Sequence, residues 1–182
     1  MCGISGIFYF ENQREAEINI LMEMTRILTH RGPDDEGYFV KNNIGLGQRR
    51  LSIIDLQGGK QPVHNEDKSV WVVFNGEIFN YIELGEDLRK RGHHFYTQSD
   101  TEVIVHAYEE YGEGFLQHLN GQFAIALWDD KNKSLLLARD RVGIRPLFYS
   151  NLDNKTFLFA SEIKSIFKYP ESPREIDPRG VE

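Results

Sequence analysis

The chain has 182 residues, of which 40% are hydrophobic and 12% aromatic, which is enough for one sizeable domain with a substantial core. Its formal net charge is −7, whereas nucleic-acid-binding proteins typically carry an excess of basic residues. Its single cysteine excludes an internal disulfide. The start of the chain lacks the basic region and long apolar core of a signal peptide, and no apolar run approaches the roughly 18 residues that cross a bilayer. We therefore expect a cytoplasmic protein with neither a nucleic-acid nor a membrane partner.

The first part of the chain is predicted to alternate strands with one helix. Period-two and β-branched patterns indicate the strands, and apolar residues at helical spacing indicate the helix. We expect strands over 3–10, 38–40, 44–54 and 70–74, a helix over 18–28, and loops over 30–37 and 57–69. Two helices should follow. One begins near Asn80, where N-Y-I-E resembles a capping box, and the other begins at Ser99, where S-D-T-E fits that pattern better.

The remainder is predicted to form hairpins and one short helix. We expect paired strands over 123–129 and 134–140, a second pair over 146–150 and 157–161, and a helix over 161–169. The tail, 171–182, is polar and punctuated by proline. Strands, then helices, then more strands favour an α+β fold of antiparallel sheets with helices packed on them.

The cysteine lies at position 2, directly behind the initiator methionine. A small residue there favours removal of Met1, which would give Cys2 a free α-amine. The ordinary pKa of that amine, roughly 7.7–8.0, lies near the value of about 8.5 for a thiol, so one residue would hold both a nucleophile and its base. The simpler interpretation is a small buried hydrophobe in a strand.

Two rival site types are disfavoured by spacing. A Cys–His pair is the usual alternative, but none of the six histidines has a diagnostic position. His93 and His94 are too close together for a helical metal pair, and no second cysteine is present, so we expect no metal site. A phosphate-binding glycine loop is also absent from the sequence.

The opening MCGISGIF is followed by four further segments that together form a recognisable pattern: HRGPDDEG (30–37), RRLSIID (49–55), FNGEIFN (74–80) and QSDTEV (98–103). Together they resemble the N-terminal glutaminase domain of the class II glutamine amidotransferases, and most closely its asparagine synthetase branch. The resemblance continues through NGQFAIALWD (120–129), ARDRVGIRPLFY (138–149) and FASEIKSI (159–166), to about Pro170.

The resemblance implies a four-layer α/β/β/α sandwich of two antiparallel sheets, the N-terminal nucleophile hydrolase fold. It also implies hydrolysis of the glutamine side-chain amide to glutamate and ammonia through a thioester on Cys2. The oxyanion would be stabilised by the Asn75 side chain and the Gly76 N–H. L-Glutamine would be held by Arg50 and the backbone near Ile53 and Ile54 at its α-carboxylate, and by Asp100, Glu77 and Gly76 at its α-ammonium.

Each assignment has a simpler interpretation when its residue is taken alone. Asp100 would complement the dipole of the helix expected to begin at Ser99. Arg50 would be a solvated surface arginine, and Asn75-Gly76 a turn signal. Their joint occurrence in family order favours the glutaminase reading.

We therefore expect a glutaminase domain over 1–170, and a linker or the truncated start of a synthetase domain over 171–182. The resemblance implies that such a C-terminal domain uses ATP and Mg²⁺ to convert aspartate to asparagine with the ammonia, whereas the glutaminase domain needs no cofactor; a homodimer is compatible with it. The alternatives are another ammonia acceptor, another amide hydrolase of the same architecture, and a catalytically silent glutamine-binding regulatory module.

Overall fold

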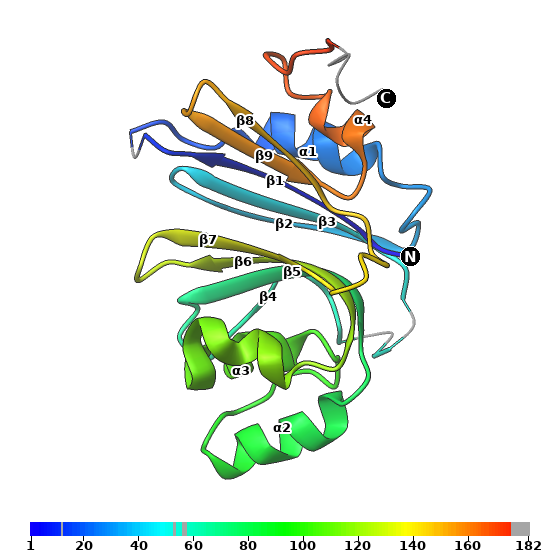
Figure 1. Cartoon of the computed structure of the whole chain (residues 1–182), viewed down its shortest axis with the longest axis vertical. Coiled ribbons are helices and arrows are strands. Elements are labelled where there is room, and N and C mark those ends of the chain that lie inside the picture. The colour runs from blue at the N-terminus through cyan, green and yellow to red at the C-terminus, as the bar shows by residue number, and fades with distance from the viewer. Residues whose placement is uncertain (12, 53, 56–57, 176–182) are drawn as a thin grey trace.

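The computed structural model describes residues 1–11, 13–52, 54–55 and 58–175, and these form two stacked β-sheets with helices on both outer faces (Figure 1). One sheet contains five strands in the order β2-β3-β1-β9-β8, and the other contains four in the order β4-β5-β6-β7. Every pairing is antiparallel. The strands are β1 (Gly3–Tyr9), β2 (Asp35–Lys41), β3 (Ile44–Arg50), β4 (Val63–His64), β5 (Val70–Ile78), β6 (Gly121–Asp129), β7 (Ser134–Arg139), β8 (Phe148–Leu152) and β9 (Thr156–Ala160).

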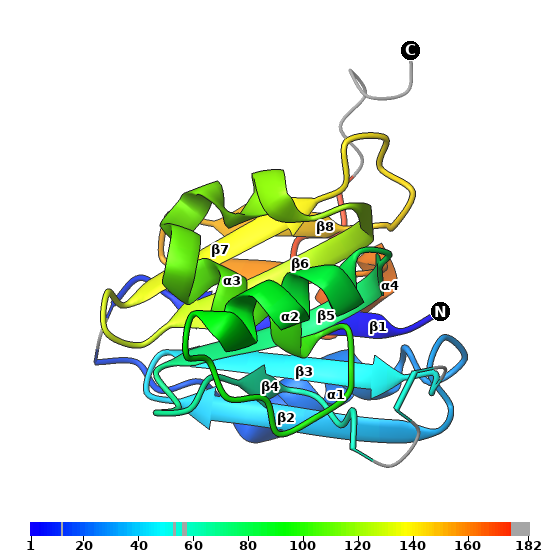
Figure 2. The same ribbon diagram turned by 90° about the horizontal axis from the view of Figure 1, so that it is seen from below.

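The helices complete a four-layer α/β/β/α sandwich, as the sequence led us to expect. Helices α1 (Ile18–Arg26) and α4 (Ile163–Ile166) pack on the five-stranded sheet. Helices α2 (Tyr81–Lys90) and α3 (Glu102–Tyr111), followed by the 3₁₀ helix η1 (Gly112–His118), cover the four-stranded sheet (Figures 1 and 2). No helix of the described chain is long and apolar enough to span a membrane.

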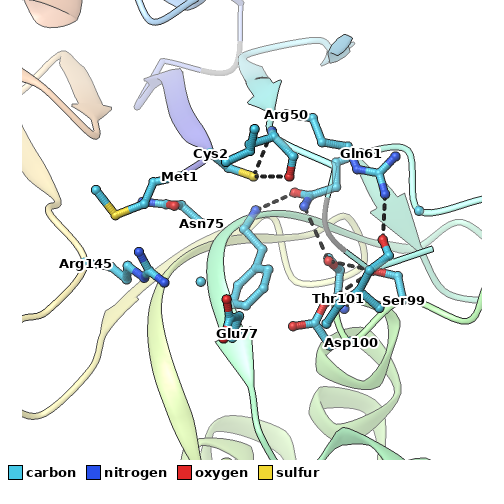
Figure 3. Close-up of a pocket in the computed structure, with 15 residues that line it drawn as sticks. Met1, Cys2, Arg50, Gln61, Asn75, Glu77, Ser99, Asp100, Thr101 and Arg145 are labelled. Atoms are coloured by element: carbon cyan, nitrogen blue, oxygen red, sulfur yellow. Dashed lines mark hydrogen bonds between the residues drawn. The ribbon is translucent and has the colours of Figure 1, made fainter. Parts of the chain in front are cut away.

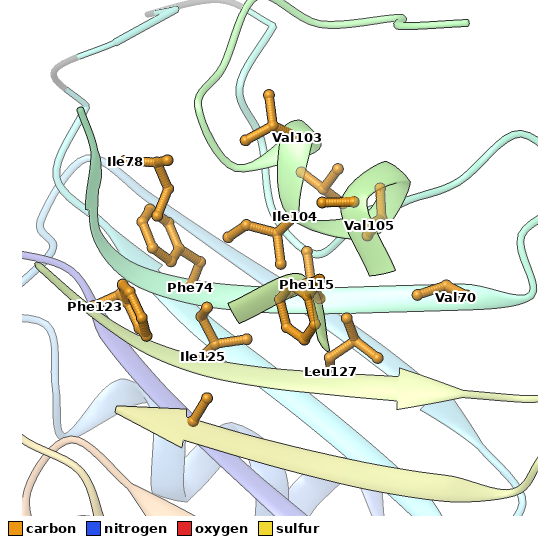
Figure 4. Close-up of a cluster of buried hydrophobic side chains, with 14 of the residues drawn as sticks. Val70, Phe74, Ile78, Val103, Ile104, Val105, Phe115, Phe123, Ile125 and Leu127 are labelled. Carbon is orange, nitrogen blue, oxygen red and sulfur yellow. The ribbon is translucent and has the colours of Figure 1, made fainter. Parts of the chain in front are cut away.

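Strand β6 explains why the sheets stack as they do. Its side chains alternate between two buried faces: Ala124, Ala126 and Trp128 face the other sheet, whereas Phe123, Ile125 and Leu127 face the helical layer (Figure 4). A strand covered on both faces needs an uninterrupted apolar run, which is what the sequence from 123 to 128 provides.

Two boundaries differ from the prediction in ways that matter for the site. Strand β5 continues through Asn75 and Gly76 instead of ending there, because both residues pair with β6. Helix α3 begins at Glu102, not at Ser99, because the Glu102 carboxylate accepts backbone N–H groups of Tyr96 and Thr97 and the helix starts around it. The turn reading of Asn75-Gly76 and the placement of Asp100 in a first helical turn were therefore wrong.

Smaller differences lie in the loops. Strand β3 ends at Arg50, four residues earlier than predicted, and the short strand β4 lies inside the predicted loop over 57–69. The capping box at Asn80 does not form, because its side chain bonds instead to the backbone of His118 and Asn120.

Candidate active site

The alternation of the strands directs three site residues toward the space between the two sheets. Ile4 of β1 and Leu46 of β3 belong to the core between the sheets, as does Val73 of β5. Side chains separated by an even number of positions share a face of a strand. Cys2, Arg50 and Asn75 therefore lie on facing surfaces, at the edge of the sandwich where the N-terminus lies (Figure 1).

These side chains line a pocket of about 270 Å³, a size that suits a small ligand. Figure 3 shows Cys2 on one side of the pocket, Asp100 and its neighbours on another, and Arg145 on a third. The pocket brings together seven of the eight residues predicted from the sequence: Cys2, Arg50, Ile54, Asn75, Gly76, Glu77 and Asp100. The eighth, Ile53, lies outside the described residues.

Cys2 is half-buried, and backbone groups hold its sulfur. Its Sγ lies 3.4 Å from the Leu51 nitrogen, which donates to it, and 3.7 Å from the Leu51 carbonyl oxygen. These two backbone contacts fix the position of the sulfur at the wall of the pocket. Met1 lines the same pocket, so the backbone nitrogen of Cys2 is next to it.

Arg31 fixes the backbone of Cys2 from the other side. Its Nε donates to the Cys2 carbonyl oxygen at 2.9 Å, and its Nη1 pairs with Glu162 at 3.1 Å. Burial raises the pKa of Glu162, but Lys164, His30 and Arg31 outweigh that effect and lower the pKa to about 2. The carboxylate that holds Arg31 therefore stays charged at neutral pH.

Asn75 presents an unusual amide. Its side chain is buried, and its Nδ2 has no hydrogen-bond partner among the described residues. A buried donor without a partner costs free energy, on the order of 1–3 kcal/mol, which a ligand oxygen would recover. This amide is the donor that the sequence predicted for an oxyanion.

Gly76 is constrained by its neighbouring strand. The structure gives a steric reason for glycine at this position. A Cβ atom at position 76 would overlap the carbonyl oxygen of Gln122 and would lie 2.8 Å from the Cα of Phe123, both on β6. Glycine therefore allows β5 and β6 to stay paired beside the pocket.

Asp100 is a buried carboxylate without a cationic partner in any described contact. It accepts a hydrogen bond from the Ile78 N–H at 3.0 Å and one from the Ser99 hydroxyl at 3.4 Å. Burial raises the pKa of Asp100, the Ile78 and Ser99 hydrogen bonds lower it, and the charge of Glu77 raises it further, with a net upward shift. A pocket that desolvates a carboxylate in this way favours a cationic ligand group.

Arg50 has a structural role that the sequence did not reveal. Its Nη2 donates to the carbonyl oxygens of Ile54 and Asp55 at 2.9 Å and 2.6 Å. The Asp55 carboxylate in turn accepts N–H groups of Gly58 and Gln98. The buried guanidinium thus holds the loop after β3 against the pocket and still lines it.

Four polar residues of the pocket were missed: Gln61, Ser99, Thr101 and Arg145. Gln61 bonds the Thr101 hydroxyl at 3.3 Å and the Phe74 N–H at 2.7 Å, so it connects the loop after β3 to β5. Arg145 follows β7, and its buried Nε has no partner among the described residues. The only sequence signal was that Gln61 and Arg145 lie in or beside family-like segments.

Chemically, the pocket joins a nucleophile, an unpaired amide donor, carboxylates and a guanidinium. That set suits acyl transfer from a small zwitterion that has a side-chain carbonyl. Within the described residues, the one cluster of three or more potential metal ligands lies outside this pocket.

Comparison with known proteins agrees with this chemistry. The family described as "Glutamine amidotransferase domain" matches residues 1–182. Asparagine synthetase [glutamine-hydrolyzing] 2 of Bacillus subtilis is 48% identical over 179 residues, which cover 97% of this chain and 24% of that protein. A putative asparagine synthetase of Methanocaldococcus jannaschii is 42% identical over 187 residues, which cover 92% and 33%. The chain thus spans about a quarter to a third of these relatives.

One solved structure shows the same fold at lower sequence identity. Glutamine phosphoribosylpyrophosphate amidotransferase of B. subtilis, in complex with ADP and GMP, aligns with a TM-score of 0.74 and 22% identity. The alignment covers 91% of this chain and 43% of that one.

Proposed function

This chain belongs to the glutamine amidotransferase domain family, and we propose that it hydrolyses the side-chain amide of glutamine to glutamate and ammonia at Cys2. The observation that carries the proposal is the pocket that Cys2 shares with the unpaired Asn75 amide and the buried Asp100 carboxylate. This arrangement supports the proposal because a nucleophile, an oxyanion donor and a partner for an α-ammonium group would be needed around one small cavity, and the thiol, the amide and the carboxylate suit these roles.

Activation of the nucleophile begins with removal of Met1. The freed α-amine of Cys2 then takes the thiol proton, directly or through a water molecule, and the sulfur attacks the amide carbon. This step is supported by the place of Met1 in the pocket lining and by the bond from Arg31 that fixes the Cys2 carbonyl.

Attack moves an electron pair onto the amide oxygen. The Asn75 Nδ2 and the Gly76 N–H stabilise that oxyanion. When it collapses, the C–N bond breaks and ammonia leaves with the proton held by the α-amine. Water then hydrolyses the Cys2 thioester, releasing glutamate and restoring the thiol.

Recognition of both α-groups would make the site selective for free glutamine. Asp100, with Glu77, binds the α-ammonium, and the planar Arg50 guanidinium binds the α-carboxylate together with backbone near Ile54. The upward pKa shift of Asp100 supports its part, because the carboxylate lacks a charge partner until substrate arrives.

The ammonia acceptor lies beyond this domain. We propose that residues 1–170 are the glutaminase domain, that 171–182 begin a linker, and that a C-terminal synthetase domain amidates aspartate with ATP and Mg²⁺. The supporting observation is that relatives named glutamine-hydrolysing asparagine synthetases are about three to four times longer than this chain. The glutaminase domain itself uses no cofactor.

The test is intact-mass spectrometry of the chain after incubation with the glutamine analogue 6-diazo-5-oxo-norleucine. We expect loss of one methionine and one adduct, which peptide mapping places on Cys2. The matched control is Cys2→Ala, which should stay unlabelled and release no ammonia from glutamine. Ammonia release by Cys2→Ala at the parent rate would overturn the mechanism, and glutamine binding without labelling of the parent would indicate a regulatory module.

A further inference from the structure

A second group of polar side chains lies away from the pocket, at one end of α3. It consists of Glu66, His93, His106 and Glu109, and we refer to it as the His93–His106 cluster. Glu66 lies in the turn between β4 and β5, His93 in the connection between α2 and α3, and the other two on α3. One potential ligand atom from each residue lies within 4.8 Å of the others.

The separations fit a small tetrahedral ion. The Nδ1 atom of His106 lies 3.4 Å from Glu66 Oε2 and 3.3 Å from Glu109 Oε2. The Nδ1 atom of His93 lies 3.7 Å from Glu66 Oε1 and 3.8 Å from Glu109 Oε2. Zinc bound at about 2.0–2.1 Å in a tetrahedron requires ligand atoms about 3.4 Å apart. These four separations differ from that value by no more than about 0.4 Å, and the remaining pairs of ligand atoms lie within 4.8 Å of one another.

Each of the two imidazoles has a carboxylate at its other nitrogen. His106 Nε2 lies 3.4 Å from Glu102, which is fully buried, and His93 Nε2 lies 3.5 Å from Glu110. A carboxylate in that position holds the proton on Nε2 and leaves Nδ1 free to bind a metal.

The two carboxylates are oriented as well. Asn65, itself buried, donates to Glu109 Oε1 at 2.7 Å, and the His94 backbone N–H donates to Glu66 Oε1 at 2.8 Å. Glu109 thus presents its other oxygen, Oε2, to both histidines, whereas Glu66 presents Oε2 to His106 and its bonded Oε1 to His93. Each of the four ligands thus has a second polar partner, an arrangement found around metal ions in proteins.

We propose that the His93–His106 cluster binds one divalent transition-metal ion, with zinc as its occupant. Two imidazole nitrogens favour zinc over Mg²⁺ and Ca²⁺, which take six or more oxygen ligands. With neutral histidines, Glu66 and Glu109 supply a charge of −2 that the ion balances. His106 is completely buried, so the ion would lie partly out of solvent.

The role of such an ion would be structural. It ties the turn before β5 and the connection between α2 and α3 to α3 itself. The residues just before α3, Ser99 to Thr101, line the catalytic pocket. The ion therefore stabilises the element that positions Asp100, without contacting the substrate.

A proton is the competing occupant. Burial lowers the pKa of His106, but its bonds to Glu102 and Glu109 and the charge of Glu66 raise it to about 9. A protonated His106 would hold the same carboxylates by ion pairing alone. Zinc would require His93 as a ligand, whereas a proton on His106 would not.

The experiment uses the untagged full chain, stripped with a chelator and titrated with zinc in a calorimeter, with Co²⁺ absorption as a probe of tetrahedral geometry. The matched variants are His93→Ala and His94→Ala, because the neighbouring His94 side chain is exposed and outside the cluster. We expect one zinc per chain for the parent and His94→Ala, and binding weaker by at least about 100-fold for His93→Ala.

Thermal unfolding gives an independent readout. Zinc at 100 times its dissociation constant should raise the Tm of the parent and of His94→Ala by about 5–10 °C, and should leave His93→Ala unchanged. Absence of saturable zinc binding, or equal binding by both variants, would overturn the proposal and leave the proton as the occupant.

Discussion

The guanidinium of Arg31 donates from Nε to the carbonyl oxygen of Cys2 at 2.9 Å. The bond crosses from the loop after α1 to the start of β1, and the Arg31 side chain is mostly buried. Glu162, after β9, holds the same guanidinium at 3.1 Å. Three segments therefore fix the residue that carries the sulfur, although the sequence analysis gave Arg31 no part in catalysis.

Replacement of Arg31 by Ala should impair positioning of Cys2 more than binding of glutamine. We expect kcat to fall by about 10–100-fold, since small displacements of a nucleophile have effects of that size, while KM changes little. Steady-state ammonia release and Tm together test this. The control is Arg26→Ala, whose exposed guanidinium pairs with Glu36 at 3.6 Å; an equal loss in both variants would indicate general destabilisation.

Replacement of Asn75 by Ala removes the unpaired donor. We expect kcat to fall by about 10²–10³-fold, as for other oxyanion donors, with a smaller change in KM. The substitution breaks no hydrogen bond at Nδ2, because this amide nitrogen has no partner among the described residues, so we expect no loss of stability from that source. Chemical denaturation measures that point. A variant as active as the parent would remove Asn75 from the mechanism.

Replacement of Asp100 by Asn should weaken glutamine binding while stabilising the fold. Loss of a buried charge partner for the α-ammonium should weaken binding by roughly 30-fold or more, measured by calorimetry in the Cys2→Ala background. In the protein that keeps Asp100, the affinity for glutamine should fall as the pH drops through the pKa of the Asp100 carboxyl, which burial raises above its ordinary value. The Asn variant should bind weakly with little pH dependence.

The stability effect of Asp100→Asn has the opposite sign. An acid whose pKa is raised by folding contributes stability below its unfolded pKa and loses it as pH rises through its folded pKa. At neutral pH the free energy of unfolding of the Asn variant should therefore exceed that of the parent by about 0.5–2 kcal/mol. The difference should shrink as the pH falls through the raised pKa of Asp100 toward the ordinary range of aspartate; a difference that grows there would contradict the assignment.

Replacement of Gly76 by Ala should disrupt the pairing of β5 with β6. The added Cβ would overlap the Gln122 carbonyl oxygen, so we expect a loss of about 1–3 kcal/mol or failure to fold. Gly114→Ala is the matched control, because a Cβ there has no heavy atom within 4 Å. Denaturation midpoints of the two variants separate the effects, and equal stability would refute the steric argument.

Local patterns in the sequence were sufficient for most of the fold. The apolar run of β6 and the β-branched and aromatic composition of β1 both predicted strands that the structure confirms. Boundaries failed where tertiary contacts decided them. Asn75 and Gly76 have the composition of a turn, yet pairing with β6 extends β5 through them. Glu102 begins α3 because its carboxylate binds the preceding loop.

The same division applies to the site. By itself, the sequence predicted the proposed nucleophile at position 2 and, through ordered segments, the family and six further residues of the pocket. Only the tertiary structure decided that Arg31 holds Cys2, that Gln61 and Arg145 line the pocket, and that His93 lies beside His106. Periodicity reports on neighbours along one element, whereas these contacts join segments tens of residues apart. Their geometry follows from how two twisted sheets and their helices pack, which no local pattern encodes.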